Sequence, residues 1–286
     1  NISNGRFGFQ VALTDLNGDG KADLAVAAFN ETNANGDGGA GAVYLFEGRD
    51  INAPATTLLD AGAADLKLSG DNSSDNFGWA LETGDLTGDG IEDLLITAAA
   101  DELPGQPGGT GVVHVLAAAS SGTLAALSPQ PARSIRGAAS SDRFGQGMTP
   151  VQDRDGDGVS DLAVFASRID RIGLDVGDLL FAPSTQFDSP DNFVALDFDD
   201  VPGGSWIGYA TAFVGDVNGD GKPELAVGAP FREDASTNAI NGGSVMIYTS
   251  TPTGFSTMPA KILHGFATHS SSDSFGWSLA NAGDFD

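Results

Sequence analysis

The sequence predicts an all-β protein, and within that class a β-propeller of four-stranded blades. A Phe-Gly pair recurs through the 286 residues, beginning at Phe7, Phe77, Phe144 and Phe275. Ile207-Gly208 stands at the one position where a further pair is expected. The five positions are 70, 67, 63 and 68 residues apart. An Asp-rich nonapeptide and then an apolar run follow each of the first four copies. The 40 glycines show no collagen period and therefore indicate many tight turns.

Short apolar runs mark the strands of each period. The run directly after the nonapeptide reads Leu24–Val26, Leu94–Ile96, Leu162–Val164 and Leu225–Val227. A Gly/Asn-rich loop separates it from a second β-patterned run, at Ala42–Phe46, Val112–Leu116, Leu179–Phe181 and Val245–Tyr248. A less regular segment then leads to the next Phe-Gly. Each period therefore reads as about four strands without an amphipathic helix.

Four-stranded units in tandem favour the blades of a propeller. A β-sandwich module needs about 100 residues, and the turns of a β-helix are shorter than these units. We expect one propeller segment over residues 1–286, with repeats at about 5–74, 75–141, 142–204 and 205–272, and with 273–286 beginning a fifth.

Composition excludes several functions. Thirteen Lys and Arg stand against 39 Asp and Glu, so the net charge of -26 repels nucleic acid. With no cysteine, the chain has no disulfide, no thiolate metal site and no cysteine nucleophile. No apolar run reaches the ~18 residues of a membrane-spanning helix, so we expect no membrane span in this segment.

The nonapeptides predict calcium sites. Oxygen-bearing side chains occupy positions 1, 3, 5 and 9 of every complete copy: Asp15, Asn17, Asp19 and Asp23; Asp85, Thr87, Asp89 and Asp93; Asp153, Asp155, Asp157 and Asp161; Asp216, Asn218, Asp220 and Glu224. Glycine at position 6 permits a sharp turn. That turn aims the carbonyl of position 7 inward as a further ligand, at Lys21, Ile91, Val159 and Lys222. About six oxygen ligands in a flexible loop suit Ca²⁺ better than Mg²⁺, zinc or copper.

An EF-hand opens with the same residue pattern but requires a glutamate at position 12 and flanking helices. Position 12 here is apolar in every copy, so the EF-hand is rejected. We expect about four ions, bound most weakly in the copy with Thr87 and most tightly in the copy with Asp153. A fifth loop begins at Asp284 and Asp286.

The motifs together resemble a known family. Phe-Gly, the Asp-rich loop and the run Ala226–Pro230 are similar to the FG-GAP repeats of integrin α-subunit propellers, and Gly243–Tyr248 looks like that family's third strand. The resemblance spans essentially the whole chain, although Gly-Ala-Pro survives only in the fourth unit and the third unit is the most degenerate. The resemblance implies seven blades, which would need roughly 470 residues. We therefore expect a segment of a longer protein.

The functional expectation is binding without catalysis. The acidic residues are committed to metal, and no Gly-x-Ser-x-Gly motif is present. The resemblance implies a protein or glycan partner on the face of the long loops, opposite the calcium loops; these long loops are 29–40, 101–110, 167–177 and 230–242. Two functions stay open: an extracellular adhesion or interaction module, and a carbohydrate-binding or non-catalytic propeller attached to an enzyme domain elsewhere. Calcium loops without cysteine indicate a secreted or cell-surface protein, because extracellular calcium fills weak sites.

The Phe-Gly pairs are expected to serve architecture. Each pair precedes its nonapeptide by eight or nine residues, which suits one strand. We expect the phenylalanine to pack between neighbouring blades and the glycine to let another backbone approach closely.

Overall fold

The structure is a computed structural model. It describes residues 5–48, 61–101, 109–138, 142–151, 153, 157–166, 178–187, 194–195, 206–233, 242–251, 254–265 and 273–280. Over these residues the secondary structure is β-strand, apart from three short 3-10 turns, at η1 (Ala61–Ala63), η2 (Leu124–Ala126) and η3 (Ser184–Gln186). The prediction of an all-β fold is confirmed.

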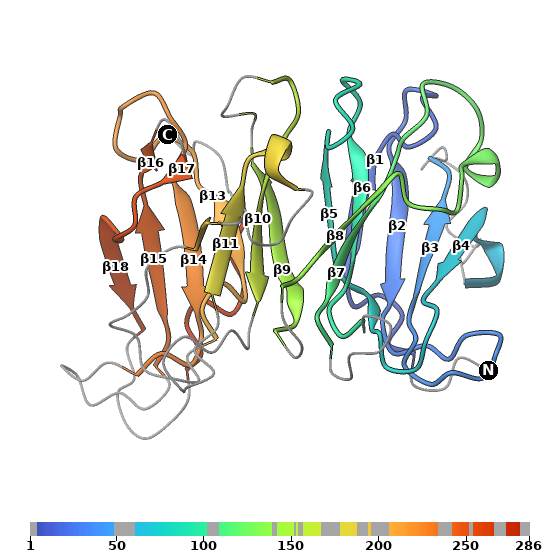
Figure 1. The fold of residues 1–286 in the computed structure, drawn as a ribbon, viewed down its shortest axis with the longest axis horizontal. Helices are drawn as coiled ribbons and strands as arrows, with labels where there is room; N and C mark the ends of the chain where they lie inside the picture. Colours follow the sequence, from blue (N-terminus) through green and yellow to red (C-terminus); the bar gives the residue numbers. More distant parts are fainter. Residues whose placement is uncertain are drawn as a thin grey trace, which may run out of the picture. The chain divides into compact units, whose positions relative to one another are not determined.

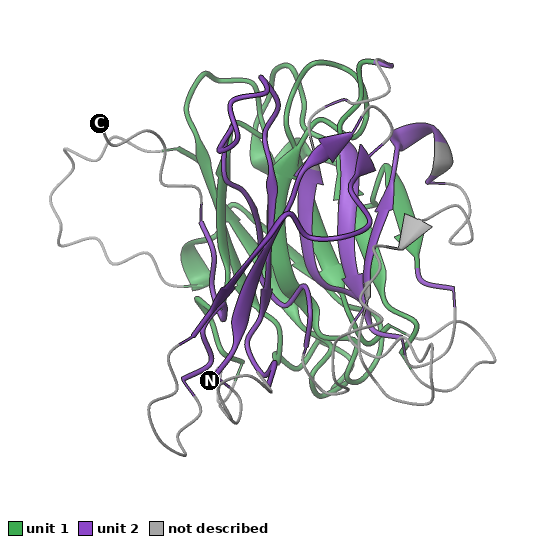
Figure 2. Cartoon of the chain, turned by 90° about the vertical axis from the view of Figure 1, so that its left-hand side faces the viewer, with its two compact units in different colours: residues 1–136, 158–160 green, residues 137–157, 161–286 purple. Residues whose placement is uncertain are grey.

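The chain divides into two compact units (Figure 2). Unit 1 holds residues 1–136 and 158–160, and unit 2 holds residues 137–157 and 161–286. Each unit contains two four-stranded antiparallel sheets, which we call blades (Figure 1).

Unit 1 contains the first and second blades. The first blade has the order β1-β2-β3-β4, and its strands are β1 (Val11–Thr14), β2 (Asp23–Ala28), β3 (Ala42–Phe46) and β4 (Leu66–Ser69). The second blade has the order β5-β6-β7-β8, formed by β5 (Phe77–Gly84), β6 (Asp93–Ala98), β7 (Val112–Leu116) and β8 (Arg133–Arg136).

Unit 2 contains the third and fourth blades. The third blade consists of β9 (Phe144–Val151), β10 (Asp161–Ala166), β11 (Asp178–Ala182) and β12 (Val194–Ala195). The fourth blade consists of β13 (Thr211–Phe213), β14 (Leu225–Ala229), β15 (Ser244–Tyr248) and β18 (Lys261–His264). A separate hairpin, β16 (Ser250–Thr251) with β17 (Gly254–Phe255), precedes β18 and was not predicted.

Each blade is an antiparallel meander, so its connections alternate between its two ends. The nonapeptides join the first strand to the second at one end. The long loops that follow the second strand leave from the other end. The predicted second and third strands are confirmed, because β-rich apolar runs bounded by glycine leave little choice of register.

The apolar faces of paired blades form the cores. In unit 1, Ala25, Ala27 and Val43 of the first blade share one buried cluster with Leu94 and Ile96 of the second. In unit 2, a second cluster joins strands of the third and fourth blades, including Ala163, Phe165, Val227 and Met246. Burying both faces of the central strands explains their nearly continuous apolar sequence.

The Phe-Gly pair acts as a joint between the blades of unit 1. Phe77 is buried in the shared core, and its backbone bridges to Gly41 of the first blade. Gly41 has φ of 87°, and a Cβ there would lie 2.2 Å from the carbonyl oxygen of Phe77. Gly78, with φ of 88°, faces Val43 so closely that a Cβ would lie 3.0 Å away. Glycine at both places permits the close approach of two backbones.

The expected burial of this phenylalanine between blades holds for Phe77, Phe144 and Ile207, whereas the first and last copies have a blade on one side only among the described residues and are exposed. Phe7 is 40% exposed and Phe275 is 42% exposed. Phe7 packs on Tyr44 within its own blade, with ring centroids 5.4 Å apart, whereas Phe77 has the first blade of unit 1 against it. Phe275 is bridged to Gly243 of the fourth blade as Phe77 is to Gly41, but the described residues hold no further strand of its own repeat. Burial of this side chain therefore requires both the preceding blade and the strands of its own repeat.

Candidate metal loops and aromatic clusters

Four Asp-rich loops connect the first and second strands of the four blades. We name them the first (15–23), second (85–93), third (153–161) and fourth (216–224) metal loops. They follow β1, β5, β9 and β13 in turn (Figure 1). Residue 155 of the third loop, together with Asp284 and Asp286, lies outside the described residues.

The carboxylate at position 1 of each loop accepts hydrogen bonds from backbone amides of the same loop. In the fourth loop, Asp216 accepts hydrogen bonds from Gly219 N at 2.6 Å, Asp220 N at 3.0 Å and Gly221 N at 2.7 Å. The backbone hydrogen bonds, led by that from Gly221, lower the pKa of Asp216. Both glycines have positive φ, 82° and 84°, so position 4 needs glycine as much as position 6 does. The sequence pattern predicts that need only at position 6.

The same pattern recurs in the other loops. Gly20 N donates to Asp15 at 2.8 Å, Gly90 N donates to Asp85 at 2.8 Å, and Asp157 N donates to Asp153 at 3.2 Å. The amide of position 7 donates to the carboxylate of position 5, from Lys21 to Asp19 at 2.8 Å and from Ile91 to Asp89 at 2.9 Å. In the fourth loop, Lys222 N likewise donates to Asp220 at 2.9 Å. These bonds hold the position 1 and position 5 carboxylates within their loops.

The carboxylate at position 9 has a second role that sequence reasoning missed. Asp23 is buried and accepts from Leu16 N at 3.0 Å and from Gly48 N at 2.7 Å. Asp93 does the same with Leu86 N at 2.9 Å and Ala118 N at 3.1 Å. Burial raises the pKa of both carboxyl groups, against the opposing effect of these hydrogen bonds. Position 9 therefore ties the metal loop to the chain that follows the third strand.

Asp161 of the third loop repeats this tie. It accepts from Ser184 N at 2.9 Å, and the Ser184 hydroxyl donates to Asp157. The recurrence of the tie in three blades shows that part of the acidic pattern serves the fold itself.

The fourth loop brings three carboxylates together. Oxygen atoms of Asp216, Asp220 and Glu224 lie within 4.8 Å of one another, the one such cluster among the described residues. Position 9 is glutamate here, one methylene longer than the aspartate of the other loops. Glu224 still accepts from Val217 N at 2.8 Å, and Asn218 Nδ2 donates to it at 2.7 Å. Three convergent hard oxygens fit a calcium ion.

Position 3 differs between the loops. Asn17 Oδ1 accepts from Asp19 N at 3.0 Å, and Asn218 Oδ1 accepts from Asp220 N at 2.8 Å. Thr87 instead donates its hydroxyl to Asp93 at 3.4 Å. The second loop therefore uses position 3 to support position 9. In the first loop, Lys21 Nζ forms an ion pair with Asp19 at 3.0 Å, and that side-chain hydrogen bond lowers the pKa of Asp19.

Aromatic side chains gather at the opposite ends of the strands, where the first strand begins and the second ends. In unit 1, the first aromatic cluster comprises Phe9, Phe29 and Trp79: Phe9 lies 4.4 Å from Phe29, and Phe29 lies 4.8 Å from Trp79, between ring centroids. The guanidinium of Arg6 stands 5.2 Å from the ring centroid of Phe29.

Unit 2 has a comparable cluster, between the fourth blade and the residues that begin the fifth repeat. The second aromatic cluster comprises Trp206, Tyr209, Phe231 and Trp277, joined by centroid distances of 4.8 Å for Trp206–Phe231 and 4.7 Å for Tyr209–Trp277. Tyr209 and Trp277 each follow the glycine of a Phe-Gly or Ile-Gly pair, as Phe9 and Trp79 do. Trp206 is 40% exposed and Trp277 is 46% exposed. Sequence periodicity would have revealed part of each cluster, because an aromatic residue recurs after the glycine of the pair. It would not have revealed Trp206 or Phe231, which stand where the first repeat has Arg6 and Asn30.

Three of the four long loops lie largely outside the described residues, at 102–108, 167–177 and 234–241. The loop after β2 is described, and Asn33 stabilises it with hydrogen bonds. Its Oδ1 accepts from the backbone amides of Asn35 and Asp37, and its Nδ2 donates to the carbonyl oxygen of Gly70, after β4, at 3.2 Å. No helix among the residues described is long and apolar enough to cross a membrane.

Comparison with known proteins identifies the repeat. The family model for the FG-GAP repeat matches residues 7–46, 77–116 and 208–240. The first two segments begin at the Phe-Gly pair and end at the last residue of β3 and of β7. The third blade is unmatched yet has the same four-strand order.

The chain is also similar to integrin alpha subunits. It is 32% identical to integrin alpha-PS2 of Drosophila melanogaster over 179 residues, which is 58% of this chain and 12% of that protein. It is 35% identical to integrin alpha-IIb of Mus musculus over 167 residues, 56% of this chain and 15% of that protein. A shorter match of 82 residues, 40% identical, covers 29% of this chain and 6% of integrin alpha-7 of Rattus norvegicus. The chain thus matches only a small part of these relatives' length.

Proposed function

Because the chain is built of FG-GAP repeats like those of integrin alpha subunits, we propose that it is a calcium-stabilised interaction module of a secreted or cell-surface protein. The proposed role is binding without catalysis. The observation that supports this best is the pair of aromatic clusters at the ends of the strands opposite the metal loops, one between the first and second blades and the other between the fourth blade and the residues that begin the fifth repeat. Exposed tryptophans grouped with other aromatic rings are typical of protein-binding surfaces.

The metal loops would supply rigidity at the other ends of the strands. Asp216, Asp220 and Glu224 would hold calcium in the fourth loop, and the equivalent positions would hold it in the first three. Calcium would neutralise the carboxylates that each loop concentrates, which otherwise repel one another. We propose about four ions, one for each complete loop, as the sequence predicts.

A thermal-melting experiment tests the role of calcium. An ion bound only to the folded state adds about 2.7 kcal/mol per site at a hundredfold excess over its Kd. The melting temperature in millimolar calcium should therefore exceed that in EDTA by several degrees, and Asp216→Asn should lose part of the difference. The control is Asp273→Asn, which removes one carboxylate outside the metal loops. Identical melting curves in EDTA and calcium would refute a structural role for the ion.

A binding array tests the interaction surface. The chain would be applied to immobilised extracellular-matrix proteins and glycans, as the unchanged sequence and as Trp206→Ala and Trp277→Ala. Protein spots should be bound, and each tryptophan variant should bind at least tenfold more weakly. Val217→Ala is the matched control, since Val217 is an apolar side chain 62% exposed in a metal loop. Binding to glycan spots alone would favour the alternative function, a carbohydrate-binding propeller.

A further inference from the structure

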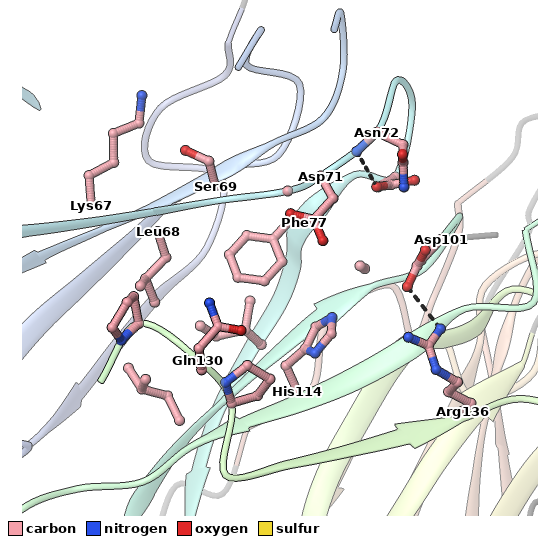
Figure 3. Close-up of a pocket in the computed structure, with 17 residues that line it drawn as sticks. Lys67, Leu68, Ser69, Asp71, Asn72, Phe77, Asp101, His114, Gln130 and Arg136 are labelled. Atoms are coloured by element: carbon pink, nitrogen blue, oxygen red, sulfur yellow. Dashed lines mark hydrogen bonds and ion pairs between the residues drawn. The ribbon is translucent and has the colours of Figure 1, made fainter. Parts of the chain in front are cut away.

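A pocket in unit 1 lies apart from the metal loops. It has a volume of about 380 Å³ and lies between the strand β4 of the first blade and the strands β5 to β8 of the second. Leu68, Phe77, Ile96 and Leu116 form apolar wall, and polar and charged side chains complete the lining. Figure 3 shows the ring of Phe77 facing the pocket together with His114 and Gln130.

Asp75 is the unusual member of this lining. Its side chain is only 3% exposed. One carboxylate oxygen, Oδ2, accepts a hydrogen bond from Asn72 N at 2.8 Å. The other, Oδ1, is buried and has no hydrogen-bond donor among the described residues. A buried acceptor without a donor is costly in a folded protein, so this oxygen calls for a ligand that donates.

The charges around Asp75 favour a cation. Two cationic side chains line the pocket, but both are already paired: Lys67 Nζ with Glu31 at 2.7 Å, and Arg136 Nη1 with Asp101 at 3.1 Å. Asp71 and Asp75 line the same pocket with no cationic partner among the residues that the structure describes. The lining therefore carries two uncompensated carboxylates, which repel an anion and attract a positive group.

The titration of the neighbouring groups agrees with this balance. Burial and the nearby charges of Asp101 and Asp71 raise the pKa of Asp75 to about 6, against the hydrogen bond from Asn72. At pH 7.4 its carboxyl group is still ionised. Burial lowers the pKa of His114, so its ring is neutral at that pH and does not repel a cation.

The geometry selects the kind of cation. A guanidinium group binds carboxylate best through two parallel hydrogen bonds, whereas Asp75 has only Oδ1 free. An ammonium group is a compact point charge that needs a single acceptor. The apolar wall beside it suits an alkyl stem, and the ring of Phe77, 5.7 Å from His114 between centroids, offers an aromatic face. Among the described residues, the carboxylates close enough to hold a metal ion are those of the fourth metal loop, so the pocket around Asp75 is not indicated as a metal site.

We propose that this pocket binds a primary ammonium group on an apolar stem, with Asp75 Oδ1 accepting its hydrogen bond. Two sources supply this chemistry: a free alkylamine, and the lysine side chain of a docked protein. The inference does not depend on the calcium sites or on the aromatic clusters.

The test is a titration of the full chain followed by backbone amide NMR at pH 7.4. n-Pentylamine should shift the amide signals of Asn72, Phe77 and His114 saturably, and n-pentanol, of equal length but uncharged, should bind at least tenfold more weakly. Nα-acetyl-lysine methylamide distinguishes the sources. Its binding at the same amides with similar affinity assigns the pocket to a lysine side chain, and binding of pentylamine alone assigns it to a free amine.

Asp75→Asn is the decisive variant. Asparagine retains an oxygen for Asn72 N and turns an amide donor toward the pocket, so the fold is kept while ammonium binding falls at least tenfold. The variant should melt no lower than the parent chain, because it removes a buried charge. Asp273→Asn removes the same charge outside the pocket and should bind pentylamine unchanged.

A second variant tests whether the ligand occupies the pocket. Gln130 is exposed at the lining, and Gln130→Trp should fill the pocket and weaken pentylamine binding without loss of folding. The proposal is overturned if neither amine gives saturable shifts, if pentanol binds as well as pentylamine, or if Asp75→Asn binds with unchanged affinity.

Discussion

The second and fourth blades share one plan, yet they differ where the metal loop meets the sheet. Both position 9 carboxylates, Asp93 and Glu224, are fully buried. In the second blade, Asp93 accepts hydrogen bonds from Leu86 N, Thr87 N and Ala118 N. In the fourth, the longer Glu224 retains the bond from Val217 N and also approaches Asp216 and Asp220. One methylene thus shifts position 9 from a tie within the fold toward a ligand. The same nine-residue pattern carries two functions, and their proportion varies with each copy.

The largest effect on stability should come from the first residue of the Phe-Gly or Ile-Gly pair, which is buried in both the second and the fourth blade. Phe77→Ala should destabilise the chain by about 3–5 kcal/mol, and Ile207→Ala by about 2–5 kcal/mol, because each empties a buried core position. Phe7→Ala, at an exposed copy of the joint, should cost less than about 1 kcal/mol. Chemical denaturation measures all three. Equal losses for Phe7 and Phe77 would mean that a neighbouring blade does not decide the burial of this side chain.

A smaller effect on stability should distinguish the two position 9 residues, Asp93 and Glu224. In calcium-free buffer, Asp93→Ala should cost about 3 kcal/mol, because it leaves three backbone amides of the second blade without their acceptor. Glu224→Ala removes the acceptor of one backbone amide and should cost about 1 kcal/mol. Denaturation in EDTA provides the comparison, and Asp89→Ala controls for loss of a loop carboxylate that does not tie the loop to the following chain. If Glu224→Ala proved as damaging as Asp93→Ala, the distinction between tie and ligand would fail.

Exchanging the two residues at position 9 sharpens the comparison further. Glu224→Asp shortens the side chain and should weaken calcium binding at the fourth loop about tenfold, which corresponds to about 1.4 kcal/mol. Calorimetric titration with calcium measures the change. The converse variant, Asp93→Glu, should not strengthen the second loop, because its position 9 is already held by three amides. A fourth loop that binds equally well with aspartate would show that the extra methylene is irrelevant.

The smallest effect concerns pH. Glu82 lies on β5, opposite Leu95, and the equivalent residue of the fourth blade is Ala212, opposite Ala226. Burial raises the pKa of Glu82 from 4.5 to about 7. Between these values the folded chain binds more protons than the unfolded chain, so stability falls as pH rises through about 7.

Between pH 6 and pH 8 this group should therefore remove about 1 kcal/mol of stability. Glu82→Gln should abolish that part of the pH dependence, whereas Ala212→Gln provides a matched change at a position that has no carboxyl group. Melting temperatures measured from pH 6 to pH 8 give the answer. A Glu82→Gln variant with the same slope as the parent chain would contradict the assignment.

Some of this structure could be predicted because local sequence decides it. The predicted runs Ala42–Phe46 and Val112–Leu116 coincide with β3 and β7, since glycine precedes each run and apolar residues fill it. The sharp turn at position 6 of the metal loops was likewise predictable, because the sequence has glycine there and the structure gives that glycine a positive φ. These features need only a few neighbouring residues.

Other features depend on partners far along the chain. Asp93 is a tie because Ala118 lies beside it, 25 residues later, and no local pattern announces that contact. Phe7 and Phe77 have the same local motif, and only the blade packed against Phe77 makes it buried. The pocket around Asp75 arises from two blades together, so no local metal or catalytic motif of the sequence marks it. The hairpin of β16 and β17 was missed because its strands have two residues each.

The bridge between Gly41 and Phe77 has a consequence for synthesis of the chain. Every blade pairs its strands in chain order, with the β16–β17 hairpin inserted before the last strand of the fourth blade, so a blade can form as soon as it leaves the ribosome. The first blade nevertheless keeps one apolar face uncovered until Phe77 emerges, 36 residues after Gly41. During that interval the nascent chain exposes Ala25, Ala27 and Val43 to other proteins. A ribosome stalled before Phe77 should therefore carry a chain bound by chaperones, and one stalled after β8 should carry a chain that has released them.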